Sequence, residues 1–251
     1  MKILNFFRSK AVQVDNDRWE MFHFLDENKN TNIVSFDTTY TDQRDREEMD
    51  DEYALIIHIP ESRLNNGLPH PEENISLNKM ENALIRSLEE AQVDCKVVGR
   101  TTFNGIKTFL FETRDGVDFQ TVCKSWQQGM GSYVVELKHT TGWSEYQNML
   151  PNKYDWQQIN DRKDIESLIR KGYTLNDSYK IEHILTGSQQ ELEDFGKKIQ
   201  KDGFKVLLES GKLLLYKSCK LVQGDISRDT KLLLHKIQSH KVEYKGWQLI
   251  N

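Results

Sequence analysis

A glutamate and a histidine, Glu182 and His183, stand next to each other in the stretch SYKIEHILT at 178–186. A carboxylate beside an imidazole could work as a general acid and base, or the two could bind a metal ion. The stretch is typical of a β-strand, however, and neighbouring side chains of a strand point to opposite faces of the sheet. The two groups therefore cannot reach the same metal ion or substrate atom. We interpret His183 as a buried histidine that is satisfied by a hydrogen bond.

The other residues that could carry chemistry form no catalytic or metal-binding pattern. No HxH, HExxH or HxxxH spacing occurs among the remaining histidines, which are His23, His58, His70, His139, His235 and His240. We expect His23 and His58 to lie in strands of one sheet, where they could approach each other. The sequence contains no GxSxG, P-loop or GxGxxG motif, and GMGSY at 129–133 leads into a strand instead of opening a helix.

Three cysteines, Cys95, Cys123 and Cys219, lie far apart without CxxC spacing. An odd, scattered set favours free thiols over a disulfide framework or a structural zinc site. Paired carboxylates such as those in TDQRDREEMDDE at 41–52 are interpreted as solvated loop charge. We therefore predict no catalytic residue, no metal ion and no cofactor, and hence a protein that is not an enzyme.

The composition is that of a globular protein, with 37% hydrophobic and 29% charged residues in 251. No apolar run approaches the roughly 18–20 residues that cross a bilayer, and the apolar stretch from Ile3 to Phe7 is too short for a signal peptide. These features predict a cytoplasmic protein without a membrane partner. Charge divides unevenly: residues 1–160 carry 17 Lys and Arg against 26 Asp and Glu, whereas residues 161–251 carry 17 against 13. The basic second part could face an acidic partner.

The elements that must position these residues occur in the order β-α-β-β-α-β, twice. Asn104-Gly105 and Ser210-Gly211 each separate two strand-like runs, as in a tight β-hairpin. Amphipathic helical patterns flank each hairpin, and the helix before the second one opens with a capping box of Ser188 and Glu191. This order predicts an α+β protein with two ferredoxin-like domains.

Two additions complete the predicted organisation. RWEMFHFLDE and TNIVSFDTTY form an extra N-terminal hairpin that enlarges the first sheet, and DIESLIRKG forms a helix ahead of the second copy. The segment 147–160 has several aromatic residues and is expected to be a connector that packs between the domains. We thus predict domains at 1–146 and 161–251, joined by 147–160.

The C-terminal part carries a resemblance to a known family. The strings IEHILTGSQQELEDFGKKIQKDGFKV at 181–206 and VEYKGWQLI at 242–250 together resemble the bacterial regulator of ribonuclease E activity B family, the ribonuclease E inhibitor proteins. The matching positions are Glu182, His183, Gly203, Phe204, Val206, Tyr244, Gly246 and Trp247. Lys245 replaces the aspartate of the family's Y-D-G-W string, and the basic charge here contrasts with the acidic family.

Residues 18–146 resemble a second bacterial family, a domain of unknown function that is found next to such C-terminal domains. Trp19, the LIIHIP strand, the paired strands VVGRTTFNGIKTFLFE and the string Trp143-Ser144-Glu145-Tyr146 carry this resemblance. That family implies no function for the first domain.

The resemblance implies a non-catalytic regulatory or adaptor protein that binds another protein and modulates RNA turnover. The specific ribonuclease target is not carried over, because a surface of opposite charge is not expected to keep the same partner. The candidate partner-binding residues are Tyr244, Lys245, Trp247, Tyr216 and Glu182. For Trp247 we favour core packing at the end of the last strand over partner binding. Two alternatives stay open: RNA binding by the basic C-terminal domain, and a hydrolase-type enzyme.

Overall fold

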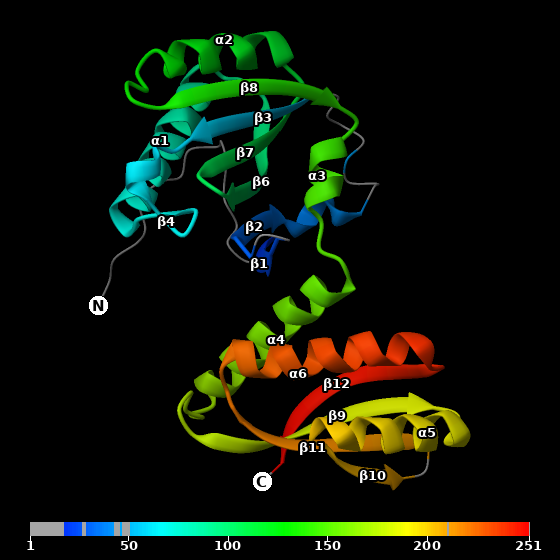
Figure 1. Cartoon of the computed structure of the whole chain (residues 1–251). Coiled ribbons are helices and arrows are strands. Elements are labelled where there is room, and N and C mark those ends of the chain that lie inside the picture. The colour runs from blue at the N-terminus through cyan, green and yellow to red at the C-terminus, as the bar shows by residue number, and fades with distance from the viewer. Residues whose placement is uncertain (1–17, 27–28, 43–45, 47–50, 210, 251) are drawn as a thin grey trace. The chain divides into compact units, whose positions relative to one another are not determined.

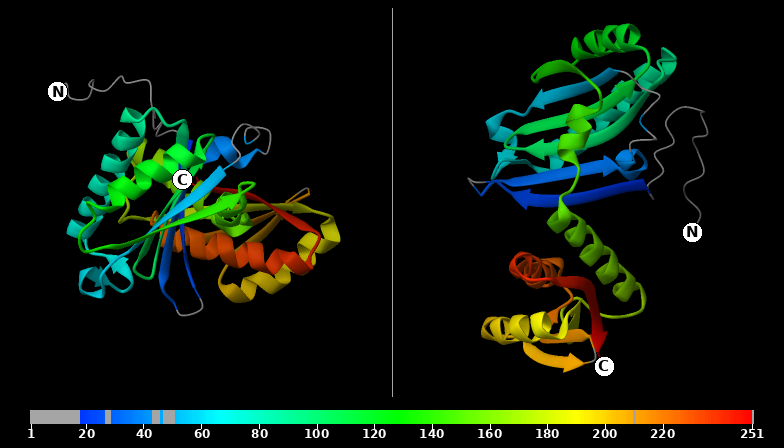
Figure 2. Two further views of the ribbon diagram at one scale, coloured as in Figure 1. Left: turned by 90° about the horizontal axis from the view of Figure 1, so that it is seen from above. Right: turned by 90° about the vertical axis from the view of Figure 1, so that its right-hand side faces the viewer.

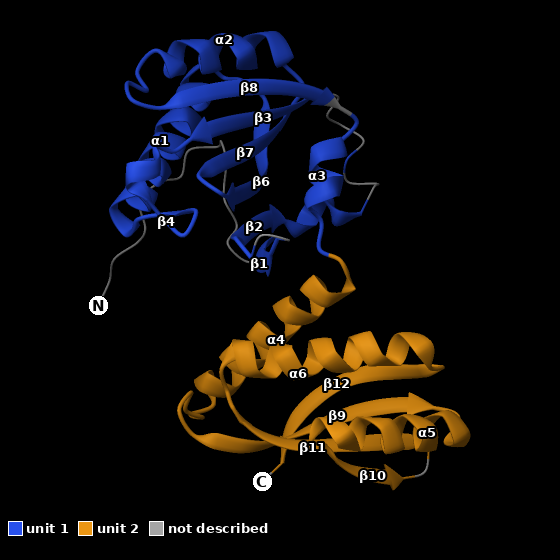
Figure 3. Cartoon of the chain, viewed as in Figure 1, with its two compact units in different colours: residues 1–151 blue, residues 152–251 orange. Residues whose placement is uncertain are grey.

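The computed structural model describes residues 18–26, 29–42, 46, 51–209 and 211–250. The chain divides into two compact units, unit 1 (Met1–Pro151) and unit 2 (Asn152–Asn251), which Figure 3 shows in separate colours. Each unit combines an antiparallel sheet with helices, so the protein is α+β, as predicted.

Unit 1 is built on a six-stranded sheet of order β1-β2-β6-β7-β3-β8, in which all neighbours are antiparallel. Its strands are β1 (Trp19–Leu25), β2 (Thr31–Asp37), β3 (Asp51–His58), β6 (Cys95–Phe103), β7 (Ile106–Thr113) and β8 (Val134–Thr141); β4 (Leu64–Asn65) and β5 (Leu68–Pro69) pair separately. The predicted turn joins β6 to β7, and both Asn104 (φ 43°) and Gly105 (φ 77°) adopt the positive φ that a tight hairpin requires. The N-terminal hairpin is confirmed, because β2 pairs with both β1 and β6.

The two faces of this sheet are covered by different elements. Helices α1 (Pro71–Glu90) and α2 (Gly116–Gln127) bury one face around Leu55, Leu84 and Phe119. The other face carries α3 (Ser144–Met149), which Figure 1 shows apart from α1 and α2. Gly99 allows this close approach, because a Cβ there would overlap the side chain of Met149.

Unit 2 has a four-stranded antiparallel sheet of order β10-β11-β9-β12. The strands are β9 (Ser178–Gly187), β10 (Lys205–Glu209), β11 (Lys212–Lys220) and β12 (Val242–Ile250), and the helices are α4 (Lys153–Arg170), α5 (Gln189–Ile199) and α6 (Gln223–Lys236). β10 and β11 pair as predicted, although Ser210 of their turn lies outside the described residues. No helix among the described residues is long and apolar enough to cross a membrane.

Helix α5 shows why the sequence folds locally as it does. Ser188 accepts a hydrogen bond from the Glu191 backbone N–H, and Leu192, Phe195 and Ile199 are buried, as the sequence pattern predicts. The predicted capping box is only half formed: the Glu191 carboxylate accepts from the backbone N–H of Lys241. This glutamate therefore ties α5 to the start of β12.

Helix α4 begins earlier than the sequence analysis expected. It starts at Lys153, inside the segment 147–160 that we interpreted as a connector. A reciprocal capping box of Asn152 and Asp155 opens the helix, since each side chain accepts from the other residue's backbone N–H. Residues 153–160 therefore belong to a helix that continues through the predicted DIESLIRKG helix.

Candidate functional site

The sheet of unit 2 carries its helices on one face only. Leu185, Leu213 and Leu215 on that face pack in one core with residues of α5 and α6, and the side view in Figure 2 shows both helices on the same side of the strands. No helix within the described residues covers the opposite face, which we call the open face. We define it by Lys180, Glu182, Ile184, Thr186, Lys205, Leu207, Glu209, Lys212, Leu214, Tyr216, Ser218, Lys220, Glu243 and Gln248.

A row of polar residues crosses the open face. It includes two of the predicted partner-binding residues, Glu182 and Tyr216. The strand register aligns Lys205, Tyr216, Glu182 and Gln248 across all four strands. The Gln248 amide donates to Glu182 Oε2 at 2.5 Å, and Lys180 Nζ lies 4.6 Å from the centre of the Tyr216 ring. Partial burial and a hydrogen bond with Glu182 raise the pKa of Tyr216. Glu182 is thus an anchored, mostly buried carboxylate, and Tyr216 is the accessible member of the pair.

An apolar row runs beside it. The register aligns Leu207, Leu214, Ile184 and Gly246. Leu207 is 44% exposed although it lies in a strand, whereas Leu214 is 8% exposed. Gly246 has a φ of 123° and no side chain, and a Cβ placed there would meet no atom within 4 Å. The row therefore ends in an open notch next to Ile184.

Four exposed lysines surround these two rows. They are Lys180, Lys205, Lys212 and Lys220. None of them forms an ion pair with a carboxylate of the described residues. Glu182 is mostly buried and Glu243 is paired with Lys245, whereas Glu209, opposite Lys212, is exposed. The four lysines therefore outnumber the accessible carboxylates of this surface.

Two other predicted residues, Tyr244 and Lys245, flank an irregularity in β12 between Tyr244 and Gly246. Tyr244 points to the helix side, where its hydroxyl lies 2.9 Å from His183 Nδ1. Burial, with a contribution from Lys217, lowers the pKa of His183 to about 4, so the ring is neutral at physiological pH. The buried, hydrogen-bonded histidine that the sequence predicted is therefore confirmed. Lys245 is exposed and pairs with Glu243 at 2.5 Å.

Trp247 also points to the helix side. Its indole N–H donates to Asp161 on α4 at 3.0 Å, and its ring packs in a cluster with Ile165 and Ile181. Asp161 is fully buried and accepts three further side-chain hydrogen bonds, from Gln157, Ser227 and Thr230. These contacts join α4, α6 and β12, so Trp247 contributes to the internal packing of unit 2.

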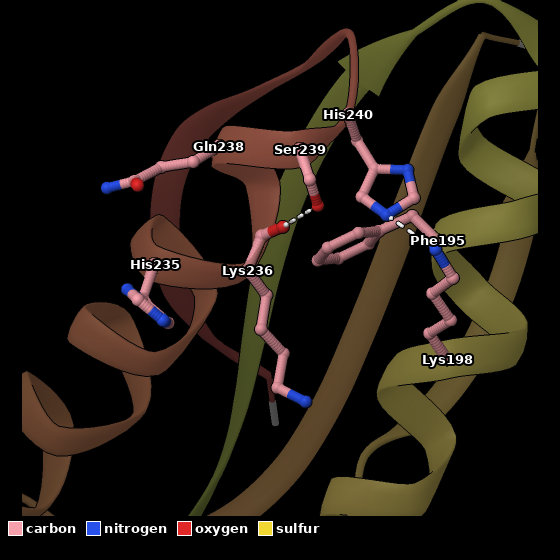
Figure 4. Close-up of a pocket in the computed structure, with 7 residues that line it drawn as sticks. All are labelled: Phe195, Lys198, His235, Lys236, Gln238, Ser239 and His240. Carbon is pink, nitrogen blue, oxygen red and sulfur yellow. Dashed lines mark hydrogen bonds between the residues drawn. The ribbon is translucent and has the colours of Figure 1, made fainter.

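A pocket of about 440 Å³ lies between the ends of α5 and α6 (Figure 4). It is lined by Phe195, Lys198, His235, Lys236, Gln238, Ser239 and His240. Lys198 Nζ lies 3.1 Å from His240 Nε2, and Lys236 Nζ lies 2.9 Å from the Asp202 carboxylate. Cations near the C-terminal ends of helices also stabilise the helix dipole. Local structure therefore accounts for these charges, and we do not assign a ligand to the pocket.

Unit 1 contains a buried carboxylate pair that the sequence analysis missed. Glu52 and Glu112 lie opposite each other on β3 and β7, and both are essentially inaccessible. Glu52 accepts from the backbone N–H groups of Glu145 and Tyr146, so it caps α3 from a neighbouring strand. Burial and the Glu52 charge raise the pKa of Glu112 to about 9. Glu52 belongs to the acidic stretch that we had interpreted as solvated, and that interpretation is wrong for this residue.

The described residues bring no catalytic cluster together. They contain no group of three or more potential metal ligands. The expected approach of His23 and His58 is wrong, because β1 and β3 are separated by three strands of the sheet. His58 instead lies 2.9 Å from Glu136 on β8. Burial raises the pKa of Cys95 and Cys123 to about 12, so neither is a thiolate at physiological pH.

Comparisons with solved structures add little to this geometry. A protein of unknown function from Galdieria sulphuraria aligns over 81% of this chain and all of its own, with 8% identity and a TM-score of 0.22. A putative glycine cleavage system transcriptional repressor aligns over 81% of this chain and 99% of its own, with 9% identity and the same TM-score. No curated protein matches the chain.

Family comparisons are more specific, and they agree with both resemblances in the sequence. Residues 17–151 match a family of unknown function, DUF695. Residues 158–248 match the regulator of ribonuclease activity B family, and this range contains the whole open face. The chain therefore belongs to the DUF695 family, and its residues 158–248 are similar to the regulator of ribonuclease activity B family.

Proposed function

We propose that this protein is a non-catalytic regulator of RNA turnover that binds another protein through the open face of unit 2. The observation that carries the proposal is the match of residues 158–248 to a family of ribonuclease regulators. The open face supports it, because an exposed leucine, Leu207, at one end of an apolar row beside polar side chains is a common feature of protein-binding surfaces. We place this activity in the bacterial cytoplasm.

The fold is part of the same proposal. We infer that both units are ferredoxin-like domains, and that the first is enlarged by the β1-β2 hairpin. The strand orders β6-β7-β3-β8 and β10-β11-β9-β12 support this inference, since each places the four core strands of a β-α-β-β-α-β series in the same relative positions. In such a fold one sheet face lies under the helices, which leaves the other available for a partner.

An RNA-cleavage assay tests the function. The full chain is added to a ribonuclease purified from the same organism, and the rate of cleavage of a labelled RNA is measured. We expect the rate to fall as the chain is added, and the two proteins to elute together in size-exclusion chromatography. An unchanged rate at saturating chain, together with separate elution, contradicts the proposal.

Two controls make this assay specific. The heat-unfolded chain should leave the cleavage rate unchanged. The chain without ribonuclease should neither cleave the RNA nor shift its electrophoretic mobility. Cleavage by the chain alone would identify an enzyme.

One observation favours a second candidate function, the binding of RNA. The four exposed lysines of the open face surround Tyr216, and a cationic surface with an aromatic ring can hold single-stranded nucleic acid. A mobility shift that weakens steeply as salt is raised would support this function.

A further inference from the structure

We propose that the open face of unit 2 binds an acidic protein segment that places an apolar side chain in the notch beside Gly246. This inference rests on the proposed function and adds the chemistry of the partner. It combines two features of one surface, an apolar row that ends in an unfilled space and a border of lysines.

The apolar row supplies the anchor site. Leu207, Leu214 and Ile184 lie side by side on three adjacent strands, and Gly246 on the fourth contributes no side chain. A leucine or similar residue of a partner can occupy this space in contact with Ile184. Burying one such side chain stabilises a complex and offsets part of the entropic cost of association.

The lysines define the charge of the partner. Lys180, Lys205, Lys212 and Lys220 are exposed around the apolar row, and they form no ion pair with a described carboxylate. Glu182 is held by Gln248 beneath the surface and Glu243 is paired with Lys245, so the four lysines are opposed on this face mainly by Glu209. A partner with Asp or Glu on both sides of its anchor meets complementary charge here.

The same surface is less suited to RNA. Base recognition on an open sheet usually depends on aromatic rings that stack on the bases. Tyr216 is the one aromatic side chain that defines the open face, and its hydroxyl interacts with Glu182. The centre of the face is aliphatic, which fits an aliphatic or aromatic protein side chain better than a nucleotide.

Synthetic peptides test the chemistry of the partner directly. The first probe is a glutamate-rich peptide with one central leucine. In a second peptide lysine replaces every glutamate, and in a third serine replaces the leucine. Binding to the full chain is measured by calorimetry in low salt, with poly(U) RNA as a further probe. We expect the first peptide to bind most tightly, by about tenfold over the second.

Matched variants locate the binding site. The double variant Lys180→Glu with Lys212→Glu should weaken binding of the first peptide by about tenfold or more. The double variant Lys197→Glu with Lys201→Glu, which makes the same change of charge near the end of α5, should not. Leu207→Ser should weaken binding, whereas Leu175→Ser, at a similarly exposed leucine outside the sheet, should leave it unchanged.

The outcomes separate this inference from the proposed function. Equal binding of the glutamate and lysine peptides, or an unchanged affinity in the Lys180 and Lys212 double variant, overturns the inference. Poly(U) that binds more tightly than every peptide and loses affinity in the same variant also overturns it, because the face then recognises RNA. If the ribonuclease is still inhibited by that variant, the regulatory function stands and only the assignment of this surface fails.

Discussion

At the scale of single residues, the two glutamates of unit 1 show how burial changes chemistry. Glu112 has no hydrogen-bond partner for either oxygen among the described residues, and it faces Glu52 across the strand pair. A protonated Glu112 can donate a hydrogen bond to Glu52. If both side chains were ionised, the two neighbouring carboxylates would repel each other in a site that is shielded from water. Glu52 is already committed to the backbone of α3. Glu112 is therefore the member of the pair that keeps its proton.

This arrangement predicts a pH-dependent stability of unit 1. The pKa of Glu112 rises from 4.5 in the unfolded chain to about 9 in the folded unit, so between these values the folded state holds the extra proton. Stability must then fall as pH rises through this range, by at most about 1.4 kcal/mol per pH unit. Glu112→Gln, which stays neutral, should remove this decline. Hydrogen exchange at amides of β3 and β7 between pH 5 and 9 measures the difference.

A matched substitution serves as the control for this prediction. Glu90 is exposed at the end of α1, and Glu90→Gln should leave the pH profile of unit 1 as it is in the unchanged chain. Parallel profiles for the unchanged chain and Glu112→Gln would show that Glu112 is ionised in the folded protein.

At the scale of elements, Asp161 explains why α4 is part of unit 2. Its carboxylate receives hydrogen bonds from residues on α4, α6 and β12, and it is completely buried. Removal of a donor from such a buried charge costs more than the loss of an exposed contact. Trp247 supplies the donor from β12, and its ring also fills the adjacent apolar cluster.

Trp247 substitutions should therefore act on stability. We expect Trp247→Ala to lower the free energy of unfolding of unit 2 by about 3 kcal/mol, and Trp247→Phe by about half as much, because phenylalanine keeps a ring but lacks the N–H. Trp156→Ala, at a tryptophan of α4 that is 36% exposed, should cost less than Trp247→Ala. Denaturant unfolding measures all three. A Trp247→Ala protein that melts within a few degrees of the original would place this residue among the partner contacts.

Sequence patterns predicted helices, strands and turns more reliably than they predicted which side chains lie on which face of a sheet. Turn residues with positive φ, such as Asn104-Gly105, and the apolar spacing of α5 depend on local chemistry and are visible in the sequence. The residues that β11 places on the open face could not be identified in this way, because β11 contains Leu213, Leu214 and Leu215 in succession. Both sides of that strand look equally apolar until the register and the helices are known.

The site residues illustrate the same limit. Strand alternation separated Glu182 from His183 correctly, since one lies on the open face and the other on the helix side. In β12 the irregularity between Tyr244 and Gly246 changes the alternation, so both Tyr244 and Trp247 point to the helices. The carboxylate pair of unit 1 was missed because its members are far apart in the sequence and meet only across paired strands.

At the scale of the whole molecule, the two units differ in how their sheets are covered. In unit 1, α3 packs on the face opposite α1 and α2, and its Tyr146 contacts Tyr40. In unit 2, the described residues provide no equivalent cover, and the exposed side chains there include four lysines, Glu209 and Leu207. We therefore propose that the partner binds unit 2.

Methyl NMR of the full chain tests this central claim most directly. Spectra with labelled leucine and isoleucine methyl groups are recorded with and without the ribonuclease. We expect large shifts for Leu207, Leu214 and Ile184, and small ones for Leu192 and Leu233, which lie in the core under the helices. Shifts confined to methyl groups of unit 1, or to the helix side of unit 2, would contradict it.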